Sequence, residues 1–251
     1  MFEAINRFFR EYVTVEHEGV MQSFRDGVGD ATSTKNIFVD PDNIKDGDDL
    51  RQQLEAQHPG LTDQIWQTLQ NEVAADNPVE FFDGLASHFL NVGASVVSPD
   101  QLQTEDGQDI CFVNEPSRHM DQKEEIINAF RGNFENLDRN ILVPGSDFDY
   151  ARALGVHEGT HCEQDNDNYA SKREQEIDAD RAALRDQLER GNTSVAKEIY
   201  EAREIGAVNG SAYTHHTASE INYDKLLKDT FNSKALGETE SQHTPPKPKV
   251  S

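Results

Sequence analysis

The segment "DFDYARALGVHEGTHCEQ", residues 147–164, decides how the rest of the chain is interpreted, because it predicts a single amphipathic helix. Ser146 or Asp147 can cap the helix N-terminus with a side-chain oxygen. Asp149 places a negative charge in the first turn, where the helix dipole favours it. Small and apolar residues along one side, from Ala151 to Cys162, supply a stripe for burial. We therefore expect a packed helix.

Two glycines interrupt this otherwise favourable helix. Gly155 and Gly159 each cost about 1 kcal/mol of helix propensity relative to alanine. Small residues are useful where a helix lies close to another element of the fold. We expect these glycines to mark a close approach of the helix to a sheet.

Two histidines four positions apart share one face of such a helix. His157 and His161 can therefore direct ring nitrogens at one Zn²⁺, at about 2.0–2.1 Å. Glu158 is displaced by one position, so we expect it to face a zinc-bound water and act as general base. A chain of this composition contains such an HExxH motif by chance in roughly 3 cases per hundred. A third ligand is needed.

The segment "EQEIDADRAAL", residues 174–184, offers that ligand on a second predicted helix. Glu176 is the preferred third ligand, and Asp180, one turn later, can accept a hydrogen bond from a ligand histidine. Glu174 and Asp178 have the same spacing and form an alternative register. A solvated acidic helix face is the other interpretation of this run.

HEGTH followed by E-x-x-A-D (residues 176–180) resembles the gluzincin metallopeptidases, especially the HtpX-like and CAAX-prenyl-protease group. The segment "NAFRGNFENLDRNILVPG", residues 128–145, is similar to the region before the metal helix in that group. The resemblance covers roughly residues 128–183. It implies a zincin fold with Glu176 as third zinc ligand, although the chain lacks the transmembrane helices of that group.

The loop "GSAYTHHTASE", residues 210–220, follows the second helix and a third predicted one. Amide hydrolysis passes through an oxyanion that needs a donor besides the metal. The resemblance implies that His215, His216 or Tyr213 fills this role. Surface histidines in a polar loop are the alternative interpretation.

The composition excludes several classes of function. The chain has 251 residues and a net charge of −24, which disfavours nucleic acids and anionic membranes as partners. No apolar stretch approaches the roughly 20 residues that span a bilayer. The N-terminus does not match a Sec signal peptide. We expect the two cysteines, Cys111 and Cys162, to stay reduced in a cytoplasmic protein; secretion by a Sec-independent route is the alternative.

The order of elements predicts a helix-rich α+β fold. Residues 1–95 read as a helical N-terminal region, residues 96–232 as a zincin-like core, and residues 233–251 as a disordered tail. Short strands are expected within residues 94–98, 109–113 and 141–144.

The sequence thus predicts a zinc metallopeptidase that binds one Zn²⁺ and cleaves a peptide or protein substrate. The helical N-terminal region can also bind a partner protein. The alternative is a catalytically inactive zincin-fold protein, or an acidic helical protein, that serves as a binding module.

Overall fold

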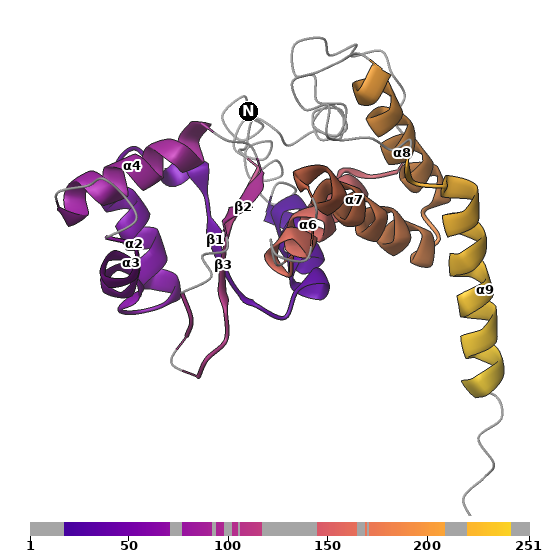
Figure 1. Cartoon of the computed structure of the whole chain (residues 1–251), viewed down its shortest axis with the longest axis horizontal. Helices are drawn as coiled ribbons and strands as arrows, with labels where there is room; N and C mark the ends of the chain where they lie inside the picture. Colours follow the sequence, from indigo (N-terminus) through magenta and orange to yellow (C-terminus); the bar gives the residue numbers. More distant parts are fainter. Residues whose placement is uncertain are drawn as a thin grey trace, which may run out of the picture.

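The computed structural model places a small mixed sheet between two groups of helices (Figure 1). It describes residues 18–70, 77–91, 94–97, 102–104, 106–116, 145–164, 169, 171–208 and 220–241. This architecture confirms the helix-rich α+β class. No helix among these ranges is long and apolar enough to cross a membrane.

Strand β3 (Ile110–Asn114) is the centre of the sheet. It pairs in parallel with β1 (Lys35–Val39) and antiparallel with β2 (Ser95–Val97), in the order β1-β3-β2. Its side chains alternate between two apolar cores, as the period of two in a strand requires. Ile110 and Phe112 enter one core, whereas Cys111 and Val113 enter the other.

The first helical group consists of α2 (Gly47–Gln57), α3 (Leu61–Leu69) and α4 (Pro78–Asn91). Its core includes Leu61 and Ile65 of α3, both fully buried. Helix α2 also covers the outer edge of β1. Gln57 Oε1 accepts from Phe38 N at 2.9 Å, and Gln53 Oε1 accepts from Asp40 N at 3.0 Å. These two side-chain amides form hydrogen bonds with backbone groups at the edge of β1, which would otherwise be open to pairing with another strand.

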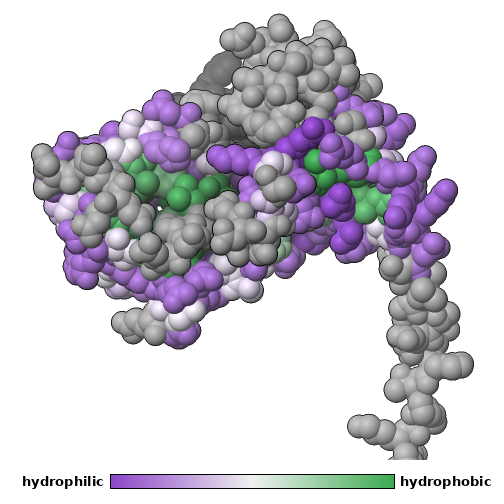
Figure 2. All heavy atoms as spheres, in the orientation of Figure 1, coloured by the Kyte–Doolittle hydropathy of each residue, from purple (hydrophilic) through white to green (hydrophobic). Residues whose placement is uncertain are grey.

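The second group includes α6 (Asp147–Cys162), the predicted metal helix, which packs against the next helix of the chain. It contains the helix of residues 18–31, α7 (Lys172–Glu189), α8 (Thr193–Val208) and α9 (Tyr223–Ser241). Ser146, one of the two predicted N-caps, caps α6, and it does so in a reciprocal capping box with Asp149 that was not predicted. Hydrophilic side chains dominate the described surface around α7 and α8 (Figure 2).

The glycines of α6 face a helix rather than a sheet, so that part of the prediction is wrong. A Cβ atom at Gly155 would lie 2.0 Å from the carbonyl oxygen of Phe24, and one at Gly159 would lie 2.7 Å from that of Val28. A Cβ at Gly27 of the opposing helix would lie 2.4 Å from Arg152 O. The two helices therefore touch backbone to backbone, and only glycine fits at the contact.

Cys111 and Cys162 form a disulfide that joins β3 to the last residue of α6. The prediction of two reduced cysteines is wrong, because the fold brings together residues that lie 51 positions apart in the sequence. The inference of a reducing compartment depended on free thiols and loses its support.

Reducing this disulfide is expected to lower the free energy of unfolding by about 4 kcal/mol, from the entropy of a 51-residue loop in the unfolded chain. Urea unfolding with and without dithiothreitol measures the difference. The unreduced, denatured protein should react with no thiol reagent and the reduced protein with two equivalents. Two reactive thiols before reduction would contradict the disulfide.

Other predicted elements differ or lie outside the described residues. Strand β1 was not expected, because "KNIFV" lies in a polar stretch rich in Gly and Asp. Helix α9 continues to Ser241, so residues 233–241 do not form the predicted disordered tail. The strand at residues 141–144, the start of the N-terminal region and residues 242–251 lie outside the described residues. The boundary at residue 95 stays a prediction, and β1 pairs across it with β3.

Candidate metal centre

Three side chains from α6 and α7 converge at one point. Nε2 of His157 and Nε2 of His161 are 3.1 Å apart. Glu176 Oε2 lies 3.3 Å from the first nitrogen and 3.6 Å from the second. His157 is buried, and the other two side chains are half-buried. Together they offer two nitrogens and one oxygen to a common centre.

The spacing of these three atoms fits a tetrahedral ion. Bonds of about 2.0–2.1 Å to Zn²⁺ place neighbouring ligand atoms about 3.3–3.4 Å apart in a tetrahedron. The three observed separations of 3.1, 3.3 and 3.6 Å scatter around that value. Two histidines and one carboxylate, with a fourth position left open, form one of the ligand sets found in catalytic zinc sites. The residues present therefore fit a zinc ion, and binding itself stays a prediction.

Each histidine has an oxygen next to its other ring nitrogen. His157 Nδ1 lies 3.0 Å from Asp180 Oδ1, and His161 Nδ1 lies 2.7 Å from Gln164 Oε1. An acceptor at Nδ1 places the ring proton there and leaves the lone pair of a neutral imidazole on Nε2. Both lone pairs then point at the same place as the carboxylate of Glu176.

The carboxylate of Asp180 is buried and lies between His157 and a cation of α8. Arg203 donates to Asp180 Oδ1 from Nε at 3.0 Å and from a terminal nitrogen at 2.8 Å. Burial alone would raise the pKa of Asp180, but Arg203 and His157 outweigh it and hold that pKa below its usual range. Asp180 is therefore ionised beside the imidazole.

The pKa of His157 reflects the concentration of negative charge at this point. Burial alone would lower it, but the carboxylates of Asp180 and Glu176 prevail and raise it to about 10. In the metal-free protein His157 is thus protonated, and the two carboxylates stabilise its positive charge. A divalent cation can replace that proton.

Glu158 is buried, with 7% of its surface exposed. Burial raises the pKa of its carboxyl, and Glu176 raises it further, whereas His157, His161 and Arg203 lower it. Its side chain does not belong to the group of three converging ligands. Glu158 therefore lies close enough to the three ligands for their charges to affect its pKa, but it is not one of the ligands itself.

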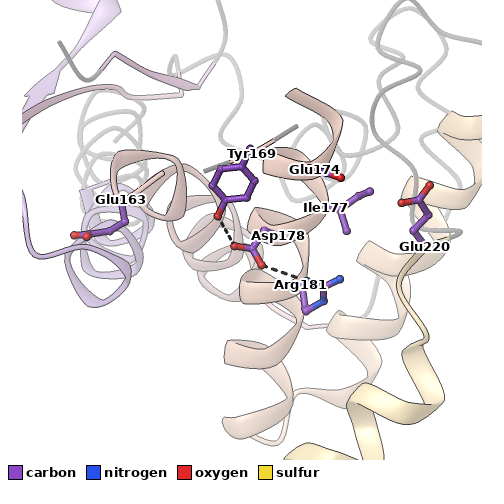
Figure 3. A pocket seen from close by; sticks show the side chains of 7 residues that line it. All are labelled: Glu163, Tyr169, Glu174, Ile177, Asp178, Arg181 and Glu220. Carbon is purple, nitrogen blue, oxygen red and sulfur yellow. Dashed lines mark hydrogen bonds and ion pairs between the residues drawn. The ribbon is translucent and has the colours of Figure 1, made fainter. Parts of the chain in front are cut away.

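The alternative third ligand, Glu174, faces away from the histidines. It lines a pocket of about 560 Å³ together with Asp178, which accepts from Tyr169 at 2.9 Å and pairs with Arg181 at 3.2 Å (Figure 3). A shift of two positions along a helix turns a side chain by about 200°. The pocket therefore lies on the face of α7 opposite Glu176, and the structure brings Glu176 rather than Glu174 to the histidines.

Three predicted residues are not located: Tyr213, His215 and His216 lie outside the described residues. Two others were missed, Gln164 and Arg203. The sequence held a weak signal for Gln164, since a helix continued through residue 164 would place it three positions after His161 on the same face. Arg203 gave no such signal, because its partner lies on another helix.

No family model matches the chain, and no curated protein or solved structure matches it either. The candidate metal centre is consequently defined by its own geometry: two histidines and a glutamate from adjacent helices, with an oxygen acceptor beside the other ring nitrogen of each histidine.

Proposed function

We propose that this chain is a zinc-dependent metallopeptidase of the gluzincin type, acting on a peptide or protein substrate. The observation that carries the proposal is the triangle of His157 Nε2, His161 Nε2 and Glu176 Oε2, whose sides match the ligand spacing of tetrahedral zinc. The resemblance of HEGTH and E-x-x-A-D to gluzincins supports the same class of activity.

Zinc, when bound, supplies a Lewis acid that polarises a substrate carbonyl and makes water acidic. His157, His161 and Glu176 would hold the ion. Asp180 keeps the His157 ring oriented, because it is fixed in turn by two hydrogen bonds from Arg203. Second carboxylates of this kind orient a ligand histidine and raise its basicity.

Glu158 would act as the general base. Its carboxylate takes a proton from the attacking water and then passes it to the nitrogen of the leaving amine. The burial that raises the pKa of Glu158 suits both steps, because a base works best when its pKa is close to the operating pH.

Metal analysis tests the proposal directly. The purified wild-type protein, supplied with zinc and then dialysed, should hold about one zinc per chain. His157→Ala and Glu176→Ala should each hold far less. Glu174→Ala is the matched control, since the same residue type is removed from the same helix on the opposite face, and it should retain wild-type zinc.

Two outcomes would contradict the proposal in different ways. A folded wild-type protein that takes up no zinc would show that the histidine pair is structural. Stoichiometric zinc without hydrolysis of any member of a peptide library would instead favour a metal-stabilised binding module.

A further inference from the structure

Gln164 connects the two helices that carry the metal ligands. It follows the end of α6, and its Oε1 lies 2.7 Å from Nδ1 of His161. Its Nε2 donates to the backbone carbonyl of Gln175 at 2.8 Å. Gln175 immediately precedes the third ligand, Glu176, in the first turns of α7. One side-chain amide thus contacts the second ligand histidine and the backbone next to the third ligand.

These two contacts fix which way the amide points. A carbonyl accepts hydrogen bonds and cannot donate one, so the NH₂ end of Gln164 must face Gln175. The oxygen end must then face His161, where it accepts a hydrogen bond only from a protonated Nδ1. The reverse orientation would bring two carbonyl oxygens together and would place the NH₂ group against the ring.

We infer that Gln164 is a positioning residue that fixes the tautomer and ring orientation of His161. The carbonyl of Gln175 orients the Gln164 amide so that its oxygen faces His161. The inference rests on the proposed metal site and deepens it. With the proton held on Nδ1, the lone pair on Nε2 points at Glu176 and at the ion. The first turns of α7 then position two ligands, Glu176 directly and His161 through Gln164.

The two histidines are held by different chemistry. His157 faces the ionised carboxylate of Asp180, which Arg203 neutralises, whereas His161 faces a neutral amide. A carboxylate partner makes an imidazole a stronger electron donor than an amide does. Gln164 therefore orients His161 without adding a further negative charge beside Glu176 and Glu158.

The test compares Gln164→Met, which keeps the shape of the side chain and removes both hydrogen bonds, with the wild type. At a pH where the His161 ring of the metal-free protein is neutral, two-dimensional ¹H–¹⁵N NMR of the histidine rings should place its proton on Nδ1. In Gln164→Met the proton should move substantially to Nε2. Zinc affinity, measured by competition with a chelator, should fall by about 10–100-fold.

Gln164→Glu is the rescue variant. Its carboxylate can still accept from Nδ1 of His161 but cannot donate to Gln175. It should keep the Nδ1 tautomer and lose less zinc affinity than Gln164→Met. Gln187→Met is the matched control, because Gln187 is a buried amide that links α7 to α6 through Asp149 O at 3.2 Å, away from the ligands. It should lower thermal stability and leave both the His161 tautomer and zinc affinity unchanged.

The outcomes separate this inference from the proposed function. An unchanged His161 tautomer and unchanged zinc affinity in Gln164→Met would overturn the role of Gln164, even if the wild type binds zinc. An equal loss of zinc affinity in Gln187→Met would show that general destabilisation is the cause, which also overturns it. A wild type that binds no zinc would refute the proposed function, and the tautomer measurement would still decide whether Gln164 controls His161.

Discussion

Glu158→Gln is expected to lower the rate of peptide hydrolysis by about 10²–10⁴-fold while the protein keeps its zinc. Glutamine has the shape of glutamate but cannot accept the proton. Glu158 does not belong to the group of three converging ligand atoms, so its replacement leaves the metal triangle intact. The measurement is kcat/KM on a quenched fluorescent peptide library, together with zinc content by elemental analysis.

Glu174→Gln is the control for Glu158→Gln, since it makes the same chemical change on an exposed face of α7. It should hydrolyse peptides at the wild-type rate. Wild-type activity in Glu158→Gln would rule out the general-base role. Loss of zinc from that variant would show instead that Glu158 is itself a ligand.

Gly155→Ala is expected to destabilise the fold by about 1–3 kcal/mol, the usual cost of overpacking a buried site. The new Cβ would lie 2.0 Å from the carbonyl oxygen of Phe24, and backbone atoms cannot rotate away as a side chain does. The helix of residues 18–31 would have to move away from α6, which carries both histidines of the candidate metal centre. Thermal unfolding and zinc content measure the two effects together.

Gly84→Ala is the matched control, because Gly84 lies within α4 and a Cβ there meets nothing within 4 Å. Alanine favours a helix over glycine by about 1 kcal/mol, so this variant should be slightly more stable than the wild type. The same substitution should thus have opposite signs at the two sites. Equal stability of both variants would contradict the backbone contact between α6 and the helix of residues 18–31.

The helices could be predicted from the sequence because their signals are local. The capping box of Ser146 and Asp149 and the apolar period of α6 and α7 lie within single segments. The same is true of β3, a short apolar run bounded by polar residues. Strand β1 was missed for the opposite reason, since a strand of five residues in a polar stretch is specified mainly by the parallel partner that it finds in β3.

The candidate site divides in the same way. The sequence by itself determined that His157 and His161 share a face and that Glu176 and Asp180 do too, because a spacing of four residues is one turn of any α-helix. Only the tertiary structure decided that Glu176 rather than Glu174 meets the histidines, that Arg203 and Gln164 support them, and that Cys111 bonds Cys162. These choices depend on how far one helix is rotated and shifted against another, and that is set by packing between distant segments, which no local pattern encodes.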